Sequence, residues 1–102
     1  MTRWLRRLRL FGGPKFIDAQ AMAKESSDTF FCPAPVALAA LQVGDIVKVC
    51  TGDERFWTII QAIDGKWISA SIDNELLNTE QHGLHCDDLI RFERRHIYAI
   101  YE

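Results

Sequence analysis

The stretch that decides the fold is residues 54–73, which read ERFWTIIQAIDGKWISASID. Two runs rich in aromatic and β-branched residues, 56–63 and 66–72, flank the dipeptide Asp64-Gly65. Such residues favour strands, and an Asp-Gly pair between two such runs is a strong hairpin signal, because a type I′ turn needs positive φ at both central positions. The stretch therefore predicts an antiparallel hairpin with a two-residue loop at Asp64-Gly65.

That loop fixes a register, which pairs Ile63 with Lys66, Gln61 with Ile68, Ile59 with Ala70, and Trp57 with Ile72. One face then forms the core and carries Trp57, Ile59, Ile63, Ile68, Ala70 and Ile72. The opposite face mixes large apolar with small polar residues: Phe56, Thr58, Ile60, Ala62, Trp67, Ser69, Ser71 and Asp73. A half-apolar face is seldom left in water, so we expect the N-terminal part of the chain or a partner to cover it.

Further elements lie on both sides of the hairpin. Strands are predicted at 46–50 and 89–93, with a turn and a short strand at 96–101, and helices at 2–11 and 18–26. Pro35 to Leu41 fits either one helical turn or irregular packing. The expected fold class is α+β, mainly β: a small bent antiparallel sheet or partly open SH3-like barrel with an α-helical N-terminal extension.

Length and composition allow one domain. The chain has 102 residues, of which 48% are hydrophobic and 25% charged, which excludes a disordered tail, a collagen-like fibre and a disulfide scaffold. No run of about 18 apolar residues predicts a membrane span. We expect a basic amphipathic helical arm over residues 1–15 and a single α+β domain over 16–102, with the β core at about 44–101.

Charge is unevenly distributed. The whole chain carries a formal −2, but residues 1–15 hold five basic side chains and no acid, namely Arg3, Arg6, Arg7, Arg9 and Lys15. The rest of the chain is formally −7. A basic arm on an acidic body is suited to docking on its own body, on a second copy, or on an anionic surface. An arginine pair without a following apolar segment does not make an export signal, so we expect a cytoplasmic protein.

Several segments together resemble the bacterial DUF2314 family of small uncharacterised proteins. They are 29–33, 41–49, 54–60, 72–74, 82–84, 87–92 and 95–98. The most specific are Glu54-Arg55-Phe56-Trp57 and Arg95-His96-Ile97-Tyr98, and the resemblance covers residues 18–101. Because that family has no assigned activity, the resemblance implies a bacterial cytoplasmic domain and transfers no catalytic residue.

The residues that carry chemistry do not form a familiar site. His82, His85 and Cys86 offer three zinc ligands, but their spacing matches no standard site, and a polar surface loop explains them equally well. Cys32 and Cys50 look like packing residues, and Cys86 lies beside His85 in sequence, where neighbouring side chains diverge. We therefore expect no catalytic residue, no metal, no cofactor and no enzyme activity.

The chain is interpreted as a small non-catalytic binding or protein-interaction module. The expected partner is a protein, or a second copy bound through the N-terminal arm. The alternative is a nucleic-acid-binding module that uses the basic arm and exposed aromatic residues. The candidate interaction surface comprises Trp4, Arg6, Arg7, Leu8, Phe11, Phe56, Ile60, Trp67, Arg94 and Arg95.

Overall fold

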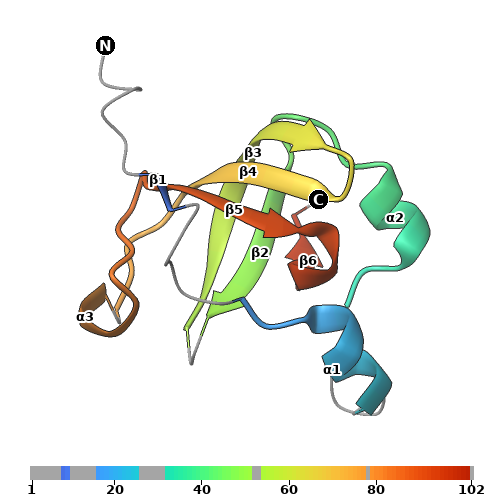
Figure 1. Ribbon diagram of the computed structural model, residues 1–102, viewed down its shortest axis with the longest axis horizontal. Helices are drawn as coiled ribbons and strands as arrows, with labels where there is room; N and C mark the ends of the chain where they lie inside the picture. The colour runs from blue at the N-terminus through green and yellow to red at the C-terminus, as the bar shows by residue number, and fades with distance from the viewer. Residues whose placement is uncertain (1–7, 10–15, 26–31, 52–53, 78, 102) are drawn as a thin grey trace.

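The protein is built on one six-stranded sheet (Figure 1). The computed structural model describes residues 8–9, 16–25, 32–51, 54–77 and 79–101. The strands are β1 (Leu8–Arg9), β2 (Ile46–Thr51), β3 (Glu54–Asp64), β4 (Trp67–Ile72), β5 (Leu89–Glu93) and β6 (Ala99–Ile100). The spatial order is β1-β5-β4-β3-β2-β6. The strands β2 to β5 form an antiparallel meander, β6 returns to pair with β2, and β1 adds a parallel edge beside β5.

Short helices lie at the two ends of this sheet (Figure 1). They are α1 (Ala19–Glu25), α2 (Pro35–Ala39), α3 (Thr79–His82) and the 3₁₀ turn η2 (Arg94–His96). α1 begins where expected because the Asp18 carboxylate accepts a hydrogen bond from the Ala21 N–H at 3.0 Å. α2 begins with Pro35, whose fixed φ suits a first helical residue. No helix in the described part of the chain is long and apolar enough to cross a membrane.

The predicted α+β, mainly β class is confirmed, since the five antiparallel strands β2 to β6 of an open sheet are accompanied by short helices. The expected helix over 2–11 is wrong at Leu8 and Arg9, which form β1 and pair with Leu89 and Ile90. Pairing to an unfilled edge of β5 satisfies backbone groups that a short isolated helix would satisfy poorly. The remaining residues of that predicted helix lie outside the described residues.

The hairpin register differs from the predicted one. Asp64 pairs with Trp67 and Ile63 with Ile68, so the two loop residues are Gly65 and Lys66. Of these two, only Gly65 has a positive φ, at 63°, as in a type II′ turn with glycine first. A β-bulge at Gln61 then shifts the register again between Ile60 and Ala62.

This register reverses the two faces of β3. Phe56, Thr58 and Ile60 are buried, and Trp57 and Ile59 are only partly buried on the outer face. For β4 the prediction was right: Ile68, Ala70 and Ile72 are fully buried. The face that we expected to need a cover is therefore the core face in β3.

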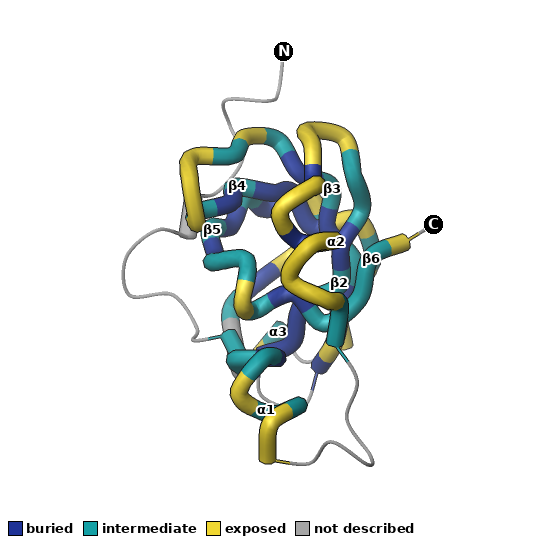
Figure 2. The backbone as a smooth tube through the Cα atoms, turned by 90° about the vertical axis from the view of Figure 1, so that its right-hand side faces the viewer, coloured by how far each residue is buried: buried dark blue, intermediate teal, exposed yellow. Residues whose placement is uncertain are grey.

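The core is closed by segments from outside the meander. Leu38 of α2 and Leu41 are buried in the same cluster as the strand residues, and Phe16 packs against it. The Phe16 ring meets Phe92 edge-on at 5.8 Å between centroids. Figure 2 shows exposed α2 in front of the buried strands and α1 at their lower end. The sequence predicts that either the N-terminal part of the chain or a partner covers the face of Phe56 and Ile60. Phe16, Leu38 and Leu41 pack against this core, so the N-terminal part of the chain covers part of it.

Candidate functional site

The structure separates the predicted interaction residues into three groups. Phe56 and Ile60 are each 1% exposed, so their assignment to an interaction surface is wrong: they form the core. Trp67, Arg94 and Arg95 remain accessible in part. Trp4, Arg6, Arg7 and Phe11 lie outside the described residues, and only the backbone of Leu8 is described.

The first accessible surface is the outer face of the sheet, opposite the core. At the hairpin end, the Arg91 guanidinium lies over the Trp67 ring at 4.5 Å from its centroid, and the Lys66 ammonium lies 5.7 Å from it. The register places Arg91 opposite Ser69, two residues along the same face of β4 from Trp67. We call Lys66, Trp67 and Arg91 the Trp67 cluster.

A second group of rings and cations lies toward the other end of this face. The Lys48 ammonium lies over the Trp57 ring at 4.6 Å, and Tyr101 meets Trp57 edge-on at 5.8 Å. Beside them Arg55 stacks on Tyr98 at 4.3 Å. These five residues are the Trp57 cluster. Sequence reasoning missed it because the wrong register placed Trp57 in the core.

Most cations of the two clusters have no described carboxylate within ion-pair distance. Lys66 contacts Glu93 at 3.7 Å, but within the described residues no carboxylate forms an ion pair with Lys48, Arg55 or Arg91. The negative face of an aromatic ring attracts a cation without neutralising it. The outer face therefore combines aromatic rings with cations. Lys48, Arg55 and Arg91 have no carboxylate within ion-pair distance among the described residues, while Asp64 and Glu93 lie on either side of Trp67 on this face.

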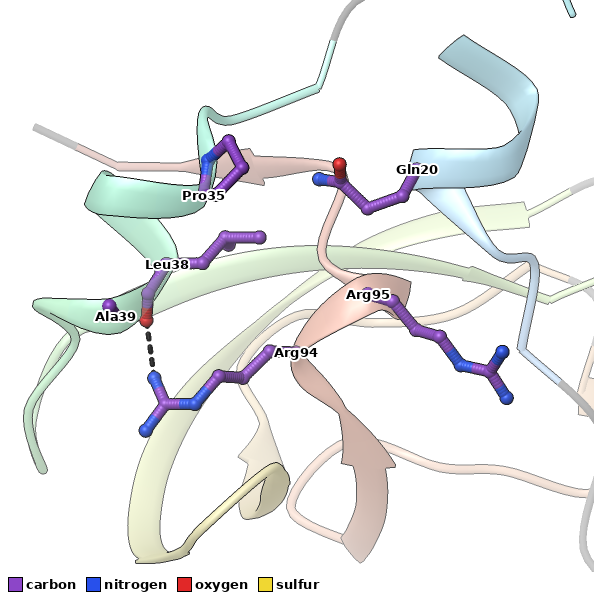
Figure 3. A pocket seen from close by; sticks show the side chains of 6 residues that line it. All are labelled: Gln20, Pro35, Leu38, Ala39, Arg94 and Arg95. Atoms are coloured by element: carbon purple, nitrogen blue, oxygen red, sulfur yellow. Dashed lines mark hydrogen bonds between the residues drawn. The ribbon is translucent and has the colours of Figure 1, made fainter. Parts of the chain in front are cut away.

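The second accessible surface is a cleft of about 440 Å³, open to solvent, between α1, α2 and η2 (Figure 3). Apolar atoms dominate its lining. The lining residues are Gln20, Pro35, Leu38, Ala39, Arg94 and Arg95. Gln20 helps to hold α1 against the start of α2, since its side-chain amide donates to the Pro33 carbonyl at 3.1 Å.

The two arginines of the cleft have different electrostatic environments. Arg95 contacts the Asp18 carboxylate at 3.2 Å and the Glu93 carboxylate at 3.3 Å, so two anions balance its charge. Arg94 instead donates to two backbone carbonyls, Gly65 at 3.0 Å and Leu38. No described carboxylate lies within ion-pair distance of Arg94. The net positive charge at this cleft therefore belongs to Arg94.

His96 is the last residue of η2, and its ring holds the turn against the end of β5. Its Nδ1 accepts a hydrogen bond from the backbone N–H of Glu93 at 3.0 Å. An accepting Nδ1 carries no proton, so the ring is neutral. Burial lowers the pKa of His96 below its usual value, and the nearby Arg95 charge lowers it further, against weaker opposing effects of Glu93 and Asp18. The ring also lies 6.2 Å from Phe16. η2 is thus stabilised by a neutral histidine.

The residues considered for metal or cysteine chemistry take structural positions. The His85 N–H donates to the Asp88 carboxylate at 2.9 Å, and the Cys86 thiol donates to the Ile72 carbonyl at 3.8 Å. Burial, followed by the Asp87 charge, raises the pKa of the Cys86 thiol, which makes it a poorer nucleophile. Among the described residues, no three His, Cys, Asp or Glu side chains converge as metal ligands would.

The geometry offers two accessible surfaces: a sheet face with stacked aromatic rings and cations, and a small apolar cleft in which Arg94 has no described carboxylate within ion-pair distance. Comparisons of the chain with protein-family models, with curated proteins and with solved structures found no match.

Proposed function

We propose that this chain is a small non-catalytic protein-interaction module, and that the outer face of its sheet is the contact surface. The observation that carries the proposal is the pair of clusters around Trp67 and Trp57. Trp, Tyr and Arg are the residue types that dominate binding energy at protein interfaces. Here they occupy a partly exposed sheet face rather than the core.

The stacking itself favours binding. The rings of Trp57, Tyr98 and Trp67 each have a cation over them at 4.3–4.6 Å, so part of the side-chain ordering that association requires already exists in the free protein. The two clusters lie about 20 Å apart, because six residues of extended chain separate Trp67 from the position opposite Trp57. That span matches a standard interface of about 800 Å² per partner.

The charge of this face indicates the partner's chemistry. Lys48, Arg55 and Arg91 carry charge that no described carboxylate balances, so a complementary surface is acidic. A second copy of the chain fits this requirement in part, since residues 16–102 are formally −7. A bacterial cytoplasmic setting and membership of DUF2314 belong to the same proposal and add no activity to it.

Nucleic acid is the alternative ligand, because aromatic rings beside cations are also the platform on which single strands stack. One observation favours protein, because the cations already occupy the ring faces that bases would need.

The test uses a captured and purified partner, for which Kd is measured by titration calorimetry. We expect Trp67→Ala and Trp57→Ala each to weaken binding at least about tenfold, which is about 1.4 kcal/mol. The matched control is Leu77→Ala, which alters an exposed side chain outside both surfaces. If both tryptophan variants bind as the wild type does, the outer face is not the interface.

A labelled single-stranded oligonucleotide provides the second arm of this experiment. We expect no binding at physiological salt. Salt-dependent binding that both tryptophan variants abolish would replace the protein-interaction proposal with the nucleic-acid alternative.

A further inference from the structure

The cleft between α1, α2 and η2 is a separate surface from the outer face, and its chemistry is different. Its wall is the apolar side of α2, formed by Pro35, Leu38 and Ala39. Leu38 retains 6% exposure although it belongs to the core, so the cleft reaches the edge of the core itself. An apolar side chain placed here would extend the core outward and lose its contact with water.

Arg94 gives the cleft its polar anchor. A guanidinium has five N–H donors, and Arg94 uses its Nε and one Nη for the carbonyls of Gly65 and Leu38. These two bonds orient the planar group, and they leave donors and a positive charge for an anion (Figure 3). Arginine held in this way is suited to bidentate recognition of a carboxylate.

We propose that this cleft binds a polypeptide segment that places an apolar side chain against Leu38 and Pro35 and a neighbouring carboxylate on Arg94. The inference does not rest on the proposed function of the outer face. The two surfaces use no residue in common, so each can fail without the other.

Three features favour a peptide over other occupants. Small-molecule sites enclose most of their ligand, whereas this cleft is open to solvent. Val36, which follows Pro35 on the same helix, is 78% exposed, so an extended occupant can cover more apolar surface than a small molecule in the cleft alone. The chain's own residues 1–15 carry five cations and no acid, and Arg94 repels them.

The probes are two blocked tripeptides, acetyl-Leu-Glu-Leu-amide and acetyl-Leu-Gln-Leu-amide, which differ only in the charge of the central side chain. Each is titrated into the full ¹⁵N-labelled chain and followed by amide chemical shifts. We expect the acidic peptide to shift Leu38, Ala39 and Arg94 with Kd near 1 mM, and the neutral one to bind about tenfold more weakly.

Two variants and a control separate binding from folding. Ala39→Glu leaves Arg94 in place but adds a competing carboxylate at an exposed position of the cleft, and we expect it to abolish the shifts. Arg94→Lys keeps the charge and loses the bidentate geometry, so binding should weaken severalfold. Leu77→Glu adds the same charge at a 91% exposed site near α3, at the other end of the sheet, and should change nothing (Figure 1).

A third probe, hexanoate, distinguishes a peptide from a free carboxylic acid. Equal binding of hexanoate and the acidic peptide would overturn the proposal in favour of a small ligand. Equal binding of the two tripeptides, or shifts that survive Ala39→Glu, would show that Arg94 does not bind the carboxylate, and the proposal would fail. Trp67→Ala must leave the titration unchanged, since the outer face takes no part in it.

Discussion

Thr58 shows how a hydrogen bond lets a polar side chain lie on the buried face of β3. Its side chain is fully buried in the core, and its hydroxyl donates to the Val47 carbonyl at 3.0 Å. A buried hydroxyl without such a partner would cost about 1–3 kcal/mol. With the bond made, Phe56, Thr58 and Ile60 together can face inward, although Thr58 is polar.

Neighbouring aromatic residues of β3 should therefore differ in their contribution to stability. Phe56→Ala removes a fully buried ring and should lower the free energy of unfolding by about 3–5 kcal/mol. Trp57→Ala removes a partly exposed ring with one stacked cation and should cost about 1 kcal/mol. Urea denaturation of both variants measures this difference, and a larger loss for Trp57→Ala would restore the register first expected.

His96 should make stability depend on pH. Its pKa is lower in the folded state than in the unfolded chain, so the unfolded state binds a proton more readily. The free energy of unfolding should accordingly fall as pH drops below about 6.5 and be constant above it as far as this group is concerned. Protonation of Nδ1 also breaks the hydrogen bond that it accepts from the backbone N–H of Glu93.

Denaturation from pH 7 to pH 5 measures this effect. We expect His96→Gln to reduce the slope of stability against pH, and His85→Gln, which alters an exposed ring, to leave it as in the wild type. Equal slopes for wild type and His96→Gln would show that another group is responsible.

At the scale of elements, the β3–β4 hairpin depends on Gly65. Its φ of 63° lies in the left-handed region, and nothing lies within 4 Å of an added Cβ, so substitution tests backbone conformation alone. Gly65→Ala should lower stability by about 1–2 kcal/mol. Gly65→Asn should cost less, because asparagine tolerates this region. Thermal unfolding compares the two, and an equal loss would argue against a backbone cause.

The hairpin also shows how far the sequence was informative. Both strands and a tight turn that contains Gly65 followed from local preferences, because β-branched runs and an Asp-Gly pair act locally. The two loop residues and the turn type were predicted wrongly. The register did not follow, since Trp57 and Ile59 are as apolar as Phe56 and Ile60. Choosing between these sets requires the bulge at Gln61 and the bond from Thr58, which depend on tertiary contacts.

The candidate site was predictable to a similar extent. The basic turn at Arg94 and Arg95 was selected as an interaction surface, and both residues line the cleft. Their different roles were not predictable, because they depend on the positions of Asp18 and Leu38, 77 and 56 residues away in sequence. Pro35 to Leu41 had remained open between a helix and irregular packing, so the cleft wall could not be anticipated.

At the scale of the whole molecule, β1 protects one edge of the sheet. It covers β5 at Leu89 and Ile90 through parallel pairing. Removing residues 1–9 should expose those backbone groups, lower stability and increase self-association, because an unpaired edge is a template for another strand. Light scattering with size-exclusion chromatography measures the oligomer fraction. Removing residues 1–7 retains β1 and is the control, so identical behaviour of the two truncations would contradict this role.

The bulge at Gln61 has a consequence for how this chain tolerates changes in length. Losing one residue from a strand ordinarily inverts every side chain beyond that point. Here Ile60 faces inward before the bulge and Ile63 after it, so a chain without Gln61 keeps strict alternation on both sides. Deletion of this one residue therefore changes the bend of the sheet and leaves both faces intact, which makes the middle of the longest strand a place where related sequences can differ in length by one.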